Sequence, residues 1–71
     1  MTDAETIARQ ALQEAKAKAK VGRIAAELGI SQPAVSQWDV VPPGRVLDVE
    51  RITGIPRHRL RPDLYPLPGA S

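Results

Sequence analysis

Apolar residues recur at helical spacing along the first quarter of the chain. This spacing predicts a helix over residues 2–17, with Thr2 or Asp3 as its N-cap. The side chains expected on its buried face are Ile7, Ala8, Ala11, Leu12 and Ala15. Neither glycine nor proline marks the end of this helix, so its C-terminal boundary stays open as far as Val21.

Two short helices joined by a Gly-Ile turn are predicted next. Residues 21–28 form the first, and Gly29 suits a left-handed C-cap. Ser31 suits the N-cap of the second, which carries Pro33 in its first turn and is expected to end at Trp38. The side chains expected to face inward are Val21, Ile24, Ala25, Leu28, Ala34, Val35 and Trp38. Trp38 is expected to be the main aromatic anchor of the core.

Prolines and glycines divide the C-terminal third of the chain. The prolines that follow Val41 end the preceding helix, and a further helix is expected from Pro43 or Arg45 to Thr53, with Gly54 closing it. Its expected buried side chains are Val46, Val49 and Ile52. A short helical turn is predicted over residues 56–60. Residues 62–71 are expected to form an extended, Pro-rich tail that packs Leu64 and Tyr65 onto the body.

Length and composition allow one small domain. The chain has 71 residues, of which 42% are hydrophobic, and the absence of cysteine excludes a disulfide framework or a thiolate metal site. We therefore predict one compact all-α domain of four to five helices over residues 1–61, followed by the tail. No apolar run approaches a membrane span, and we expect a cytoplasmic protein.

Residues 21–38 have the spacing of a helix-turn-helix unit, which enters the DNA major groove. Such a unit needs a small residue in its first helix, a residue that tolerates positive φ in the turn, and an apolar residue that anchors its second helix. Ala25, Gly29 and Val35 meet these three requirements. A helical hairpin in any small α-domain would explain the apolar positions equally well, so the exposed positions must decide between the two interpretations.

The third predicted helix exposes uncharged hydrogen-bonding side chains. An ordinary solvent-facing helix carries pairs of glutamate and lysine, whereas glutamine can both donate to and accept from the edge of an adenine. We therefore expect this side of the helix to contact base edges, with Pro33 placed to touch a thymine methyl group. We call this side the recognition face; its residues are Gln32, Pro33, Ser36 and Gln37.

Positive charge clusters on both sides of this motif, although the formal net charge is only +2. One cluster comprises Lys16, Lys18, Lys20 and Arg23, and the other comprises Arg57, His58, Arg59 and Arg61. Lysine and arginine beside a recognition helix are suited to bind phosphate, as are the N–H groups at a helix start. The residues expected to bind phosphate are Lys20, Val21, Gly22, Arg23, Arg45 and Arg57.

Two stretches of the chain resemble known regulators. ELGISQPAVSQW is similar to the helix-turn-helix of the phage Cro repressors. The following VPPGRVLDVERITGIPRHRLRPDLYP is similar to Cro-like, YdaS-type regulators of bacterial and prophage genomes. The resemblance covers about residues 21–66 and implies a lambda-repressor-like, all-helical transcription factor that binds an inverted-repeat operator as a dimer. Some members are described as antitoxins beside a partner toxin.

Two residues depart from that family pattern. Gly44 stands where an acid would open the fourth helix, and its helix propensity costs about 0.5–1 kcal/mol. Lys20 stands where a serine or threonine would cap the first helix of the motif. Neither residue belongs to the recognition face.

The chain offers little for catalysis or for a cofactor. His58 is its one histidine and lies among arginines, and neither Ser31 nor Ser36 has a histidine at a recognisable spacing. We expect no enzymatic activity, no metal and no cofactor.

The sequence therefore predicts a sequence-specific DNA-binding transcriptional regulator that represses as a homodimer, with half-sites about 34 Å apart. One alternative is an antitoxin or adaptor whose helix-turn-helix domain mainly binds a protein partner, such as a toxin. Another is a non-specific architectural DNA-binding protein. The candidate dimer surfaces are the apolar tail (Leu64, Tyr65 and Leu67) and the fourth helix (Val46 and Val49).

Overall fold

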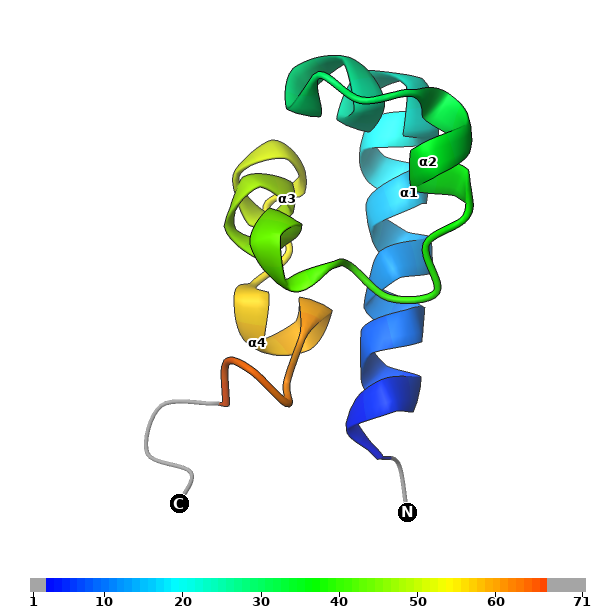
Figure 1. Ribbon diagram of the computed structural model, residues 1–71. Helices are drawn as coiled ribbons and strands as arrows, with labels where there is room; N and C mark the ends of the chain where they lie inside the picture. Colours follow the sequence, from blue (N-terminus) through cyan, green and yellow to red (C-terminus); the bar gives the residue numbers. More distant parts are fainter. Residues whose placement is uncertain (1–2, 67–71) are drawn as a thin grey trace.

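The computed structural model describes residues 3–66, which form α-helices, one 3₁₀ helix and no strand (Figure 1). The elements are α1 (Ala4–Leu28), α2 (Gln32–Ser36), η1 (Pro43–Arg45), α3 (Val46–Thr53) and α4 (Arg57–Leu60). The long helix α1 packs against α2, α3 and α4. The predicted all-α fold class is confirmed. Within the described range, no helix is both long and apolar enough to cross a membrane.

The helix α1 consists of two parts that meet at a bend at Lys20. Asp3 caps the first part by accepting the N–H of Thr6 at 2.8 Å. The backbone of Lys20 is not helical, with φ 58° and ψ 149°. Residues 21–28 follow this bend and lie across one end of the molecule (Figure 1). The boundary that the sequence left open therefore falls at Lys20, because its positive φ ends the first helical run.

The core is divided between two clusters along α1. The larger one joins α1 to the C-terminal half and comprises Ala11, Leu12, Ala15, Val41, Val46, Val49, Ile55 and Leu60. The smaller one lies around the bend and α2 and comprises Ala19, Ile24, Ala25 and Val35. Trp38 packs against both clusters. The alanines of α1 have short side chains, so neighbouring segments can approach its backbone closely.

The turn between α1 and α2 has the predicted caps. Gly29 adopts φ 71°, a left-handed conformation that glycine accepts without steric cost. The N–H of Ile30 then reaches the carbonyl of Ala25 at 3.0 Å. Ser31 caps α2 by accepting the N–H of Ala34 at 3.3 Å. These local hydrogen bonds determine where α1 ends and where α2 begins.

The predicted C-terminal end of α2 was wrong. The helix ends at Ser36, and Gln37 is its C-cap. Trp38 lies beyond the helix and is half-buried, although its N–H still donates to the carbonyl of Val35 at 3.1 Å. Because Trp38 has left the helix, its indole can contact both clusters, which a residue directed into a single core could not do.

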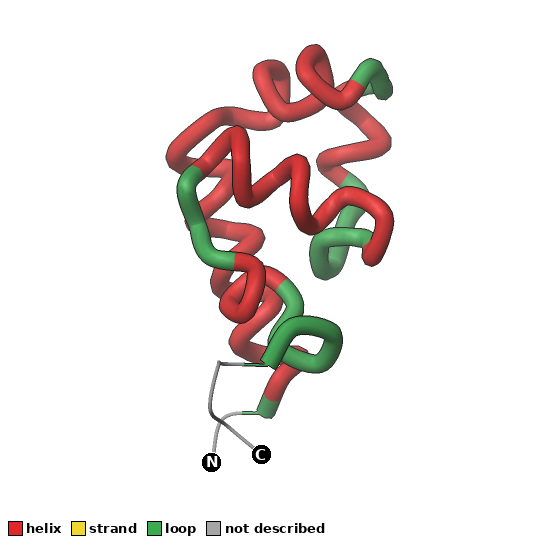
Figure 2. Tube along the Cα trace, turned by 90° about the vertical axis from the view of Figure 1, so that its left-hand side faces the viewer, coloured by secondary structure: helices red, strands yellow, loops and turns green. Residues whose placement is uncertain are grey.

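The C-terminal helices follow the prediction more closely than the tail does. Gly54 closes α3 with φ 78°, and α4 is the expected helical turn. After α4, the N–H groups of Leu64 and Tyr65 donate to the carbonyl of Arg61 at 3.1 and 2.9 Å. Residues 62–65 therefore form a hydrogen-bonded turn rather than an extended tail (Figure 2).

Burial excludes most of the candidate dimer surface. Val46 and Val49 have no solvent exposure because they belong to the larger cluster. Tyr65 packs against the same cluster and is half-buried. Leu64 does not pack onto the body as expected but is 44% exposed, and Leu47 on α3 is 50% exposed. The candidate Leu67 lies outside the described residues.

Replacement of Trp38 by alanine tests the link between the two clusters. We expect Trp38→Ala to reduce the free energy of unfolding by about 3 kcal/mol, the low end of the range for buried aromatics, because the indole is half-buried. Leu47→Ala is the control and should cost less than about 1 kcal/mol, since Leu47 is exposed. Chemical denaturation of both variants measures this. An equal, small cost for both would contradict the packing of Trp38.

Candidate nucleic-acid interface

The recognition face points away from the body of the protein because the opposite side of α2 is anchored. Val35 has no solvent exposure and packs with Ile24 and Ala25 in the smaller cluster. The four side chains predicted to contact bases are all exposed: Gln32, Pro33, Ser36 and Gln37. A short helix with a buried anchor and exposed, uncharged polar groups is thus present where the sequence predicted it.

The side chain of Gln32 lies beside the start of the second part of α1. A methyl group in place of a hydrogen on Gly22 would be 3.4 Å from Nε2 of Gln32 and 3.9 Å from its Oε1. The predicted phosphate-binding turn at residues 20–22 and the recognition face are therefore neighbours. From the sequence alone, the turn at residues 20–22 and the recognition face could be expected to be neighbours only if the helix-turn-helix geometry was assumed.

Positive charge at the bend is available for an anionic ligand. Lys20 is exposed, and within residues 3–66 no acidic side chain forms an ion pair with Lys16, Lys18 or Lys20. In the same range, no side chain caps the N–H groups of Val21 or Gly22. The first N–H groups of a helical segment lack a partner one turn earlier, so this end of residues 21–28 favours negative charge.

Arg23 is exposed beside the same turn, but it has an acidic partner. Its Nε lies 3.4 Å from a carboxylate oxygen of Glu27, four residues later on the same helix. Exposed pairs of this kind are weak. A phosphate could therefore compete with Glu27 for the Arg23 guanidinium.

The other two predicted phosphate contacts lie elsewhere in the fold. Arg45 ends η1, and Figure 1 shows that α1 separates this region from α2. Arg57 opens α4, which lies away from the bend in Figure 1. Its backbone N–H and its guanidinium both bind Glu50, at 2.8 and 3.0 Å, and the guanidinium lies 5.7 Å from the ring centre of Tyr65. The structure thus joins Arg57 to α3 and to the C-terminal turn.

The remaining arginines of the C-terminal cluster are also paired with acids. Arg59 lies 2.6 Å from Glu14 of α1, and Arg61 lies 2.8 Å from Asp63. Sequence analysis missed these acidic partners. The Arg61–Asp63 spacing could have suggested one of the pairs, whereas Glu14 is 45 residues from Arg59 and no local pattern indicates their contact. The three arginines of this cluster are therefore all paired with acids, whereas the lysines at the bend form no ion pair within residues 3–66.

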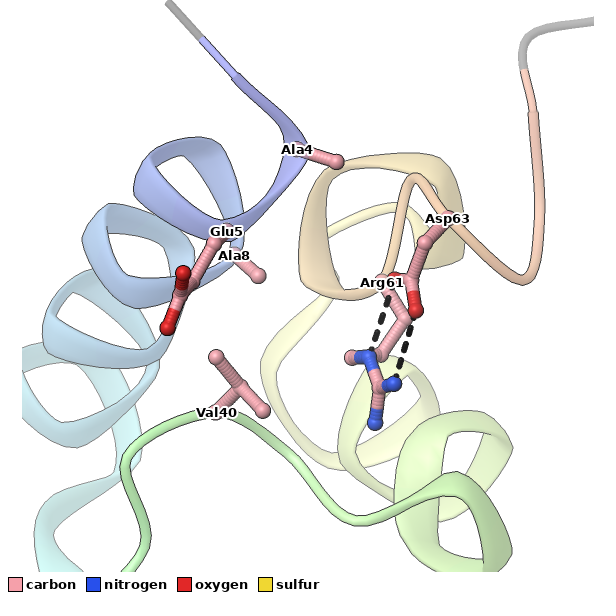
Figure 3. A pocket seen from close by; sticks show the side chains of 6 residues that line it. All are labelled: Ala4, Glu5, Ala8, Val40, Arg61 and Asp63. Carbon is pink, nitrogen blue, oxygen red and sulfur yellow. Dashed lines mark hydrogen bonds and ion pairs between the residues drawn. The ribbon is translucent and has the colours of Figure 1, made fainter.

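Figure 3 shows a shallow pocket of about 380 Å³ beside the Arg61–Asp63 pair. Ala4, Ala8 and Val40 line its apolar side. The guanidinium of Arg61 also donates to the carbonyl of Val41 at 2.9 Å, which ties the loop before η1 to the C-terminal turn. Arg61 and Asp63 are paired with each other, and the third charged residue of the lining, Glu5, is paired with Arg9 at 2.7 Å. The charged groups of this pocket therefore already have partners within the fold.

These ion pairs lower the pKa values of the carboxylates involved. The backbone N–H and guanidinium of Arg57 donate to Glu50 and hold its pKa below the ordinary value. Hydrogen bonds from Arg59 and Arg61 likewise lower the pKa values of Glu14 and Asp63. Among residues 3–66 there is no group of three or more acidic or histidine side chains that could hold a metal ion.

The fold and this face define a small all-α domain of helix-turn-helix type. A family model described as "Bacterial toxin YdaS" matches residues 15–68, which is more than half of the chain. The chain belongs to the YdaS family, and the resemblance seen in its motifs is confirmed. Comparison with curated proteins and with solved structures finds no match. The matched segment includes the bend, α2 and both C-terminal helices, so the family pattern covers the whole candidate interface.

Acidification tests the role of the paired carboxylates. A carboxylate whose pKa is lowered by folding stabilises the folded state above its unfolded pKa, and this contribution is lost as the pH falls through the folded pKa. We therefore expect the thermal midpoint to be constant near neutrality and to fall between about pH 5 and pH 3. Glu50→Gln should lower the midpoint at pH 7 and make the acid-side decrease shallower. An unchanged pH profile in this variant would contradict the assigned role of Glu50.

Proposed function

We propose that the protein is a sequence-specific DNA-binding transcriptional regulator that represses as a homodimer. The observation that carries the proposal is the orientation of α2: Val35 is fully buried, while the recognition face is exposed and uncharged. The major groove admits an α-helix, and glutamine can contact an adenine edge through two hydrogen bonds. The protein has the polar face that this chemistry requires.

The bend at Lys20 supplies the second part of a DNA contact. Phosphate contacts determine the position of a protein on the duplex, and base contacts determine the sequence it selects. Lys20 and the start of residues 21–28 are suited to bind phosphate next to Gln32. A single surface of the protein can thus contact both a DNA phosphate and a base edge of one half-site.

A homodimer follows from the small size of this surface. One short helix offers few base contacts, so two copies on an inverted repeat are needed for useful affinity. In the described range, Leu47 and Leu64 are the large apolar side chains that remain exposed. They therefore replace Val46 and Val49 as the residues at which a dimer contact is to be sought.

A second candidate function is a role in a toxin–antitoxin pair. The description of the matching family model, "Bacterial toxin YdaS", favours it. Such a protein would act on, or bind, a protein partner, and its helix-turn-helix domain could also regulate its own genes. Growth arrest on expression, unchanged when the recognition face is replaced by alanines, would favour a toxin over a regulator.

Selection of bound sequences from a random duplex pool at moderate salt tests the main proposal. We expect an inverted repeat with half-site centres about 34 Å apart. Gln32→Ala should weaken binding to this sequence by about 1–3 kcal/mol and leave binding to unrelated DNA nearly unchanged. Equal losses on both kinds of DNA would exclude base recognition by Gln32. A selection without any preferred sequence would favour an architectural or a protein-binding role.

The salt dependence of binding tests the phosphate contact. Lys20→Ala should weaken binding to all duplexes and reduce the slope of log K against log [salt] by about one unit, because one phosphate contact is lost. Arg57→Ala is the comparison variant and should leave the slope unchanged, since Arg57 is engaged with Glu50 at the other end of the molecule. A smaller slope for Arg57→Ala than for Lys20→Ala would place the phosphate contact at α4.

A further inference from the structure

The presence of a glycine at position 22 is not explained by the stability of the helix in which it lies. Gly22 lies in the helical run of residues 21–28, and its φ is not among the positive values that the chain adopts at Gly29 and Gly54. No left-handed conformation therefore requires a glycine here. Glycine destabilises a helix relative to alanine because it loses more backbone freedom on folding. A different reason for the missing side chain must be sought in its surroundings.

Outside its own helix, the atoms nearest to a side chain at Gly22 would be those of the Gln32 carboxamide. A Cβ at position 22 would be 3.4 Å from Nε2, 3.6 Å from Cδ and 3.9 Å from Oε1 of Gln32. These distances are van der Waals contacts, so a single methyl group would touch the amide without displacing it. A longer side chain would have to share the volume beside that amide. The missing side chain thus leaves Gln32 free to lie along the start of the helix.

We propose that Gly22 is a positioning residue for Gln32 and thereby determines the base that the recognition face selects. This inference rests on the proposed DNA-binding function and deepens it. With glycine at position 22, the carboxamide lies beside the N-terminal end of residues 21–28. Its Oε1 and Nε2 form no hydrogen bond within residues 3–66, so both are available as an acceptor and donor pair. That pair matches the N6 and N7 atoms of adenine. Gly22 acts through Gln32 and does not itself contact the base.

Lys20 provides an independent observation at the same turn. Its φ of 58° is sterically unfavourable for any residue with a Cβ and suits glycine. Within three residues, the chain has a lysine where glycine would relieve strain and a glycine where alanine would favour the helix. Natural proteins depart from such local preferences mainly at functional sites. Gly22 lies beside Gln32, and Lys20 precedes Gly22 by two residues.

The contact itself can be measured in the free protein. We expect nuclear Overhauser effects between the Gln32 side-chain amide protons and the α-protons of Gly22. Gly22→Ala should raise the thermal midpoint and keep the amide resonances close to their original positions, whereas Gly22→Leu should shift them. Gly44→Leu is the matched control, because nothing lies within 4 Å of a Cβ at that glycine. Absence of the Gly22–Gln32 contact in the unchanged protein would overturn the inference.

The consequence for specificity is tested by repeating the duplex selection. We expect the preference for adenine to be about tenfold lower in the Gly22→Leu variant, at the one operator position that Gln32→Ala also affects. Gly44→Leu should retain the original preference. In the Gln32→Ala background, Gly22→Leu should cause no additional loss at that position, because it acts through the side chain that is already absent.

Three results of the duplex selection would also overturn this inference. The Gly22→Leu variant could keep the full base preference, or it could bind all duplexes more weakly by the same factor. Alternatively, Gly22→Leu could reduce the base preference as much in the Gln32→Ala background as in the unchanged protein. In each of these cases the unchanged protein still selects an operator, so the proposed function stands. If the unchanged protein selects no sequence at all, the proposed function and this inference are both refuted.

Discussion

The burial of Val35 is the interaction on which the arrangement of this protein depends. Val35 packs against Ile24 and Ala25, and this contact sets the rotation of α2 about its own axis. A helix of five residues cannot hold its position by its own hydrogen bonds, because helices this short are unstable alone. The packing of Val35 therefore decides which side chains of α2 reach solvent, and the recognition face follows from it.

The bend at Lys20 is the second constraint, since it divides one long helical sequence into two directions. Without it, residues 21–28 would continue along the direction of α1 and would not lie across one end of the molecule (Figure 1). The bend also places the start of the second helical run, at residue 21, close to lysines that form no ion pair within residues 3–66. Away from the bend, Glu14, Glu50 and Asp63 pair with Arg59, Arg57 and Arg61. Charges that look similar in the sequence thus differ in the structure: these arginines have acidic partners, and the lysines near the bend form no ion pair in the described part of the chain.

The family match is compatible with the polar side chains that α2 exposes. The chain belongs to the YdaS family, and the proposed DNA-binding function rests on the exposed, glutamine-bearing side of α2. The recognition face and the exposed Leu47 lie on different helices, α2 and α3. Substitutions can therefore test the proposed DNA contact and the proposed protein contact separately.

The sequence by itself determined the features that depend on near neighbours along the chain. The caps at Ser31 and Gly29, the buried faces of the helices, and the exposed residues of α2 all follow from spacing of a few positions, whereas the first N-cap was left open between Thr2 and Asp3. Only the tertiary structure decided the contacts between distant segments. It brought Gln32 beside Gly22, paired Arg59 with Glu14 across 45 residues, and placed Trp38 between two clusters. Such contacts depend on how whole helices pack against one another, which the spacing of residues within one segment does not indicate.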